Sequence, residues 1–126
     1  VLEKLQAMGV KISIDDFGTK YSTLDYLKTY RVNRLKIPPP LIHAAMHDPG
    51  SAAMVRAIIG IARELDIEVI AQGVETEEQW SFLTATSPVP KVQGFYFSEP
   101  VLPERADELL KVGRIVPASA AADTAA

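Results

Sequence analysis

Four short aliphatic segments alternate with helix-like segments along this chain, and this alternation limits its fold more than any other feature. The segments 10–14, 34–37 and 67–71 are rich in aliphatic residues, and a fourth segment is centred on Val92. Strands that are separated by helices pair in parallel, because each helical crossover returns the chain to the same end of the sheet. The sequence therefore predicts an α/β fold with about four parallel strands alternating with helices.

The intervening segments carry helix signals. Thr76 and Gln79 form a capping-box pattern, Pro103 suits a first helical position, and Gly113 is typical of a helix end. We expect helices over residues 1–8, 23–30, 51–65, a segment that carries Trp80, and 103–112. The apolar stripe of the longest helix is predicted to bury Met54, Val55, Ile58, Ile59, Ala62 and Leu65.

Each strand–helix unit has about the length of one unit in a (β/α) barrel, whose whole is ~250 residues. This chain of 126 residues would hold about four of the eight units, which predicts half of a TIM-like barrel. The helix-like start without an initiator Met also suggests a fragment. An open doubly wound sheet is the structural alternative, but no glycine-rich phosphate fingerprint is present. We expect residues 1–113 to form the partial domain and the Ala-rich residues 114–126 to form a disordered tail.

The composition argues against several classes of protein. Hydrophobic residues make up 48% of the chain, enough to bury a core, and no apolar run is long enough to span a bilayer. The formal charge of -3 argues against a general nucleic-acid-binding protein, which would present a basic face. The absence of cysteine excludes disulfides and thiolate chemistry. The start lacks the pattern of a signal peptide. The absence of cysteine fits a reducing cytoplasm, which is the location that we expect.

A polar residue accompanies the end of each predicted strand. Asp15 and Asp16 end the first, Lys36 lies in the second, Gln72 follows the third and Gln93 lies on the fourth. The carboxyl ends of barrel strands converge at one mouth, where active sites are built. Adjacent carboxylates repel each other, so a hard cation such as Mg²⁺ or Mn²⁺ would favour burying them together. The alternatives are a solvated turn for the aspartates and a solvent-directed side chain for the lysine.

Other polar and aromatic residues have simpler interpretations. Glu75 lies in the turn that leads to a predicted helix, where an acid interacts favourably with the helix dipole. His43 and His47 have i, i+4 spacing but no HExxH pattern, and we expect them to lie on the surface or to pack against a helix. The aromatic residues at 95–97 belong to the core or the rim, and one set of them is expected to line the mouth.

Four motifs together resemble the EAL domain, and they occur in the order of that family. The resemblance runs from about Leu2 to Val112. The Asp-Asp-Phe-Gly-Thr turn and the Gly-Val-Glu-Thr turn are highly specific in combination. The matching stretches are residues 14–19 (IDDFGT), 35–37 (LKI), 69–76 (VIAQGVET) and 93–100 (QGFYFSEP).

The resemblance implies the C-terminal half of an α/β barrel that binds cyclic di-GMP at its mouth. Active members cleave one phosphodiester to give linear pGpG, using two divalent metals and a metal-bound water. By position, Asp15 and Asp16 would be metal ligands. Lys36 would orient the water or the phosphate, and Gln93 would contact the water or the metal cluster.

The resemblance also implies partners. The loop 17–23, which contains Gly18, Thr19 and Tyr21, would couple homodimerisation to the active site, and Glu75 joins these residues as a substrate or loop position. The family's first strands, with its Glu-Ala-Leu signature, would come from the N-terminal half of the barrel. A GGDEF or sensory domain is expected in the parent protein.

Three positions depart from the family pattern. The usual Glu-Gly-Val-Glu begins here with Gln72, whose amide cannot accept a proton and carries no charge. The usual Lys-Ile-Asp run ends here in Pro38, and Lys20 stands where the family loop has glycine. Two functions follow as hypotheses. One is a phosphodiesterase half-domain that is weak or inactive alone, and the other is a degenerate cyclic di-GMP-binding sensor or protein-interaction module.

Overall fold

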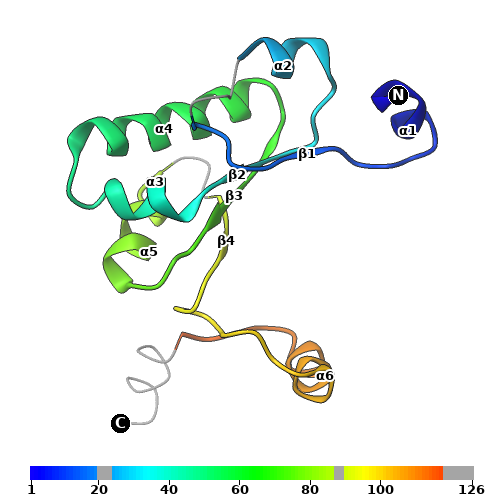
Figure 1. The fold of residues 1–126 in the computed structure, drawn as a ribbon. Coiled ribbons are helices and arrows are strands. Elements are labelled where there is room, and N and C mark those ends of the chain that lie inside the picture. The colour runs from blue at the N-terminus through cyan, green and yellow to red at the C-terminus, as the bar shows by residue number, and fades with distance from the viewer. Residues whose placement is uncertain (20–23, 87–89, 118–126) are drawn as a thin grey trace, which may run out of the picture.

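The four strands of this chain form one parallel sheet in the order β1-β2-β3-β4 (Figure 1). The computed structural model describes residues 1–19, 24–86 and 90–117. The predicted α/β class, with four parallel strands alternating with helices, is confirmed. The strands are β1 (Ser13–Ile14), β2 (Arg34–Ile37), β3 (Glu68–Gln72) and β4 (Lys91–Gln93).

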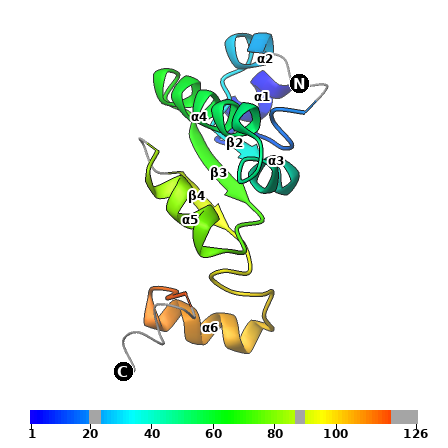
Figure 2. The same cartoon turned by 90° about the vertical axis from the view of Figure 1, so that its left-hand side faces the viewer.

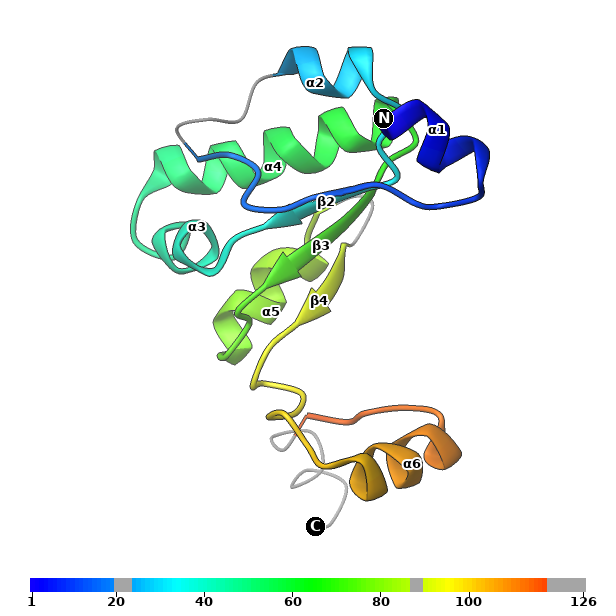
Figure 3. The ribbon, with the colours of Figure 1, turned by 45° about the vertical axis from the view of Figure 1, so that its right-hand side comes forward.

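The helices that connect the strands lie on one side of the sheet, whereas the first and last helices lie apart from it (Figures 1, 2 and 3). None of the helices in the described ranges is both long and apolar enough to cross a bilayer. The connecting helices are α2 (Leu24–Thr29), α3 (Pro39–Ala44), α4 (Pro49–Glu64) and α5 (Glu77–Thr84). The outlying helices are α1 (Leu2–Ala7) and α6 (Pro103–Val112).

The core lies between the two central strands and the helices that cover them. Leu35 and Ile37 of β2 are fully buried, and Val69 and Ala71 of β3 are buried beside them. Side chains from α3, α4 and α5 complete this layer, with Ile42, Val55, Ile59 and Leu83 among the most buried. Removing these aliphatic groups from water is the main favourable contribution to folding.

Side-chain caps begin two of the connecting helices. The Asp48 carboxylate accepts hydrogen bonds from the backbone N–H groups of Gly50 and Ser51 at the start of α4. The capping box predicted at α5 is confirmed, since the Thr76 hydroxyl accepts from Gln79 N–H and the Gln79 amide oxygen accepts from Thr76 N–H. Such caps satisfy N–H groups that have no partner within the helix.

Three details of the sequence prediction were wrong. The prolines after β2 do end the strand, but they also begin the unpredicted helix α3, because proline fits the first helical turn without needing an N–H partner. Met54 and Leu65, assigned to the buried stripe of α4, are 47% and 44% exposed. β1 is also shorter than the predicted 10–14 segment.

Two glycines offer a matched test of the packing. A Cβ at Gly94 would lie 2.0 Å from Val74 O and 2.4 Å from Val74 N, both backbone atoms, whereas a Cβ at Gly60 in α4 would meet nothing within 4 Å. Gly94→Ala is therefore expected to destabilise the fold by about 1–3 kcal/mol. Gly60→Ala should stabilise it by about 0.5–1 kcal/mol through helix propensity. Denaturant unfolding measures both, and equal effects of the same sign would contradict the packing.

Candidate functional site

Side chains of the central strands alternate between a covered and an open face of the sheet. In β2 the residues Leu35 and Ile37 are buried, whereas Arg34 and Lys36 are only half-buried. The same alternation holds through β3, whose half-buried positions include Gln72. Because successive strand residues point to opposite faces, Lys36 and Gln72 lie on the face away from the connecting helices. This open face carries most of the polar groups that the sequence singles out.

The Asp15-Asp16 turn follows β1 at its carboxyl end, and hydrogen bonds between its own polar groups stabilise it. The Asp15 carboxylate accepts a hydrogen bond from the Asp16 N–H at 2.9 Å. Asp16 adopts a positive φ of 52°, a conformation that aspartate tolerates better than most residues. The Thr19 hydroxyl donates to the Asp16 carbonyl at 2.9 Å. Both aspartates are exposed at the carboxyl edge of the sheet.

The same turn is tied to Lys36. The Phe17 N–H donates to the Lys36 carbonyl at 3.0 Å, and the Phe17 ring is buried. Ile14 is in register with Leu35, so Asp15 continues the chain beside Lys36. Gly18 follows at φ 96° and packs against Leu41 and Ile58. The turn is thereby held by the core on one side and by β2 on the other.

The two amide side chains lie on neighbouring strands. Gln72 and Gln93 are register partners in the β3–β4 pair. Lys36 pairs with Ile70, two positions earlier along β3, so the amides lie roughly 7 Å nearer the carboxyl edge than Lys36 does. Val74 N–H donates to Gln93 O at 3.1 Å, and Tyr96 N–H donates to Val74 O at 3.0 Å. These bonds fix the backbone on both sides of the amide pair.

The remaining predicted positions lie around this edge or outside the described ranges. Glu75 directly precedes the N-cap of α5, and the acids in the first turn of that helix are Glu77 and Glu78. A dipole role for Glu75 stays a prediction. The Glu75 N–H donates to Gln79 Oε1 at 2.7 Å. Thr19 is exposed, and Tyr21 lies outside the described residues.

The histidines and aromatics are distributed differently. His43 lies in α3 and His47 follows its end, so one continuous helix does not carry both. Across the ranges that the structure describes, no group of three or more His, Asp or Glu side chains is placed to hold a metal ion. The ring of Phe97 packs edge-on against Trp80, and Tyr96 packs edge-on against Phe97, whereas Phe95 is 59% exposed.

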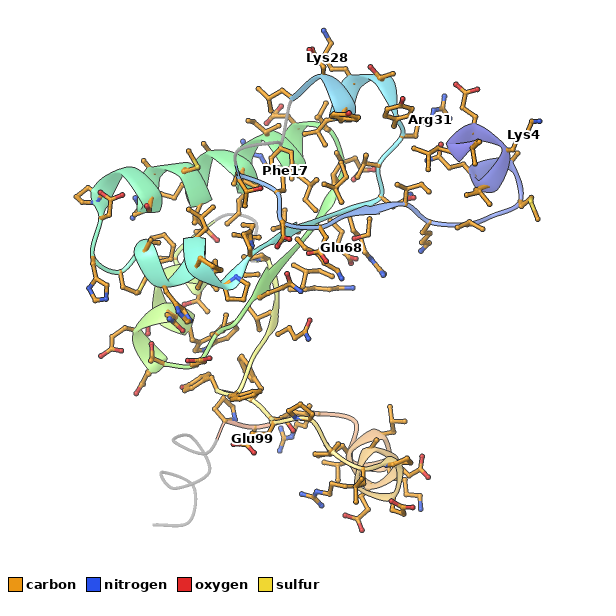
Figure 4. The ribbon with its side chains drawn as sticks, in the orientation of Figure 1. Lys4, Phe17, Lys28, Arg31, Glu68 and Glu99 are labelled. Carbon is orange, nitrogen blue, oxygen red and sulfur yellow. The ribbon has the colours of Figure 1, made fainter. Side chains whose placement is uncertain are left out.

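Sequence reasoning missed an ionic cluster on the open face. Glu68 pairs with both Arg34 and Lys91. Figure 4 shows Glu68 on the side of the sheet away from α4, and Phe17 on the side toward it. Hydrogen bonds from Lys91 and then Arg34 lower the pKa of the Glu68 carboxyl below its ordinary value. The period-two alternation that exposes Lys36 would have placed all three charges on one face.

Comparison with known protein families identifies the fold. The EAL domain family model matches residues 1–100 of this chain. That range includes every strand and the whole Asp-Asp turn. The chain belongs to the EAL domain family. The resemblance and the half-barrel fold class inferred from the sequence are thereby confirmed.

Characterised EAL proteins are similar over most of this chain. MucR of Pseudomonas aeruginosa, a bifunctional diguanylate cyclase/cyclic di-GMP phosphodiesterase, is 47% identical over 105 residues, which are 83% of this chain and 15% of MucR. The solved cyclic di-GMP complex of the MucR phosphodiesterase superimposes on this chain with a TM-score of 0.77. The match covers 83% of this chain and 42% of the MucR structure. The match thus spans less than half of that structure.

Two further EAL structures agree. The EAL domain of Mycobacterium smegmatis DcpA is 39% identical with a TM-score of 0.82, covering 92% of this chain and 51% of that one. The manganese and cyclic di-GMP complex of Klebsiella pneumoniae BlrP1 is 34% identical with a TM-score of 0.72, covering 79% of this chain and 25% of that one. This chain corresponds to about half or less of each EAL structure.

The Glu68 cluster makes stability depend on pH. The folded-state pKa of Glu68 lies below its ordinary value of 4.5, so its contribution is present above that pH and is lost as the pH falls through the folded-state pKa. Glu68→Gln should therefore lower the melting temperature at pH 7, and the difference from wild type should shrink on acidification to about pH 3. Thermal melts at both pH values measure this. Glu64→Gln, on the exposed surface of α4, controls for the change in net charge. The prediction is contradicted if the difference in melting temperature between Glu68→Gln and wild type is the same at both pH values.

Proposed function

We propose that this chain forms the C-terminal wall of a cyclic di-GMP site in an EAL phosphodiesterase domain, and that by itself it hydrolyses the nucleotide weakly or not at all. The observation that carries this proposal is the anchored Asp15-Asp16 turn beside Lys36 at the carboxyl edge of the sheet. The cyclic di-GMP complexes of MucR and BlrP1 support the ligand, because both structures share this fold.

The oxygen donors of this edge suit a hard divalent cation, Mg²⁺ or Mn²⁺. Asp15 and Asp16 would hold it through their exposed carboxylates, and the manganese complex of BlrP1 supports that class of metal. When bound, such an ion would polarise a phosphoryl oxygen and lower the pKa of a coordinated water. Within the described ranges the two aspartates have no third acidic or histidine side chain grouped with them, so additional ligands would come from the N-terminal half of the barrel.

The chain's own residues would divide the remaining tasks. Lys36 supplies a cation that can neutralise a phosphate or orient a water, because its ammonium offers three donors. Gln93 supplies an amide that can hydrogen-bond to water or phosphate but cannot accept a proton as a base. Gln72 offers a second amide beside it, at the position where active members place glutamate. The site therefore binds and orients better than it removes protons.

The other half of the barrel would cover surfaces that this chain leaves open. β4 is an edge of the sheet. Between it and α6 lies an apolar cavity of about 620 Å³, lined by Val92, Phe97, Leu109 and Ile115 among others. Val101, Leu102 and Leu110 nearby are exposed. An exposed strand edge beside apolar surface favours pairing with another segment, and the N-terminal half of the domain is the partner we propose.

The amide pair supports a second candidate function, a degenerate sensor that binds cyclic di-GMP without cleaving it. General base catalysis contributes roughly 10²–10⁴-fold to a rate, so glutamine in place of glutamate at position 72 can lower turnover by that factor while sparing recognition. A cytoplasmic location, homodimerisation through the loop 17–23 and an attached GGDEF or sensory domain remain predictions. The bifunctional protein MucR supports the last of these predictions.

The decisive measurement is pGpG formation from cyclic di-GMP with Mg²⁺ or Mn²⁺, together with calorimetry of nucleotide binding. We expect the 126-residue chain to be inactive and the full-length protein to bind the nucleotide. Gln72→Glu in the full-length protein should raise turnover by roughly 10²-fold or more, because it restores a carboxylate that can accept a proton.

Gln93→Glu is the matched control for that substitution. It introduces the same charge at the register partner of Gln72, so a gain confined to position 72 separates a specific role from a general effect of charge. Robust pGpG production by the isolated chain would contradict its inactivity. If the full-length protein shows neither binding nor turnover of cyclic di-GMP, the proposed cyclic di-GMP function is contradicted altogether.

A further inference from the structure

The turn that follows Gln72 is held from the far side of the sheet by α3. The Nε2 atom of His43 lies 3.1 Å from the Gly73 carbonyl oxygen. Because a carbonyl can only accept, the imidazole donates this bond from its Nε2–H tautomer. His43 therefore links the last turn of α3 to the residue directly after Gln72.

A second contact from α3 meets the same residue. A Cβ at Gly73 would lie 2.5 Å from Pro39 Cβ and 2.8 Å from Pro39 Cγ, and Gly73 adopts a φ of 71°. Only glycine combines that backbone conformation with so close an approach. Pro39 is the first residue of α3 and follows Pro38, which replaces the family's aspartate. Pro39 and Gly73 thus pack against each other. Each directly follows a position that differs from the family pattern, Pro38 and Gln72 respectively.

These contacts complete a frame around the Gln72 turn. β4 holds it through the bonds of Val74 with Gln93 and Tyr96. α5 holds it through the bond from Glu75 N–H to the Gln79 side chain. α3 supplies the third side through His43 and Pro39. Of these supports, the His43 bond is the easiest to test. His43 is exposed on α3, so its side chain can be replaced without altering the core.

We propose that His43 is a positioning residue, which fixes the direction of the Gln72 side chain at the site by holding the Gly73 carbonyl. This proposal rests on the proposed cyclic di-GMP function, because it assigns His43 a role in that site without contact with the nucleotide. His43 lies on the helical layer that covers the sheet, whereas Gln72 lies on the open face. The effect would pass through the backbone of residues 72–73.

Two other roles for His43 fit the structure less well. A metal-ligand role lacks support, since no group of three or more His, Asp or Glu side chains within the described residues could hold an ion. An ion pair with Glu75 is longer, at 3.9 Å, between side chains that are 45% and 51% exposed. Exposed pairs of this kind contribute little to stability. The hydrogen bond to Gly73 is the closer and better-defined contact.

The test compares His43→Ala, His43→Gln and His47→Ala in the full-length protein. Glutamine carries an amide Nε2–H at nearly the reach of the histidine Nε2, so it should restore the bond. His47 lines the same surface cavity as His43 and Glu75, but in the described part of the chain its side chain makes no hydrogen bond, which makes it the matched control. Hydrogen exchange of the peptide covering residues 72–76 and the affinity for cyclic di-GMP are measured for each variant.

For His43→Ala we expect exchange in residues 72–76 to rise and cyclic di-GMP affinity to fall, each by roughly 3- to 10-fold, the range that one lost hydrogen bond gives. His43→Gln and His47→Ala should both stay close to wild type. Unchanged exchange in His43→Ala, failure of glutamine to restore it, or an equal effect of His47→Ala would overturn the proposal. Raised exchange with unchanged affinity, in a wild type that binds, would overturn the positioning role.

The exchange measurement also separates this proposal from the function on which it rests. If the wild type binds no cyclic di-GMP, the proposed function fails. The hydrogen bond from His43 to the Gly73 carbonyl can still be tested, because the exchange of residues 72–76 does not require the nucleotide. Raised exchange in His43→Ala that glutamine restores would then support this hydrogen bond, and unchanged exchange would refute it.

Discussion

The parallel pairing of β2 with β3 is the constraint on which the rest of this structure depends. Four register pairs join Arg34–Ile37 to residues 68–71, and within them Leu35 and Ile37 are fully buried. A shift of one residue would turn these side chains out of the core and bring Lys36 into it. The hydrophobic requirement of the covered face therefore determines which polar groups reach the open face.

The polar groups at the carboxyl edge are held mainly through their backbones. The Asp15-Asp16 turn is attached to β2 by the bond from Phe17 N–H to Lys36 O. The turn after Gln72 is enclosed by α3, β4 and the cap of α5. Such anchoring lets side chains at a site differ in chemistry while their positions are kept. It explains how this chain retains the EAL framework with glutamine at position 72.

The open face of the sheet carries polar and charged side chains, whereas the covered face is apolar. Glu68 joins Arg34 and Lys91 near the amino-terminal end of the strands, whereas the aspartates and amides lie toward the other end. An apolar cavity lies elsewhere, between β4 and α6. A partner that completes the barrel would therefore meet polar groups across the sheet and apolar groups at its edge.

The sequence by itself determined the class of fold, the family and the residues of the strand ends, because hydrophobic periodicity and turn motifs are local properties. The bounds of α6 and the capping box of α5 followed from local signals too. Helix α3 was missed because three prolines were interpreted only as a strand stop. The exposure of Met54 and Leu65 could not be predicted, because it depends on which neighbours cover α4. Only the tertiary structure placed Gln72 beside Gln93, joined Glu68 to Arg34 and Lys91, and brought His43 to Gly73, since each of these contacts joins residues that lie far apart along the chain.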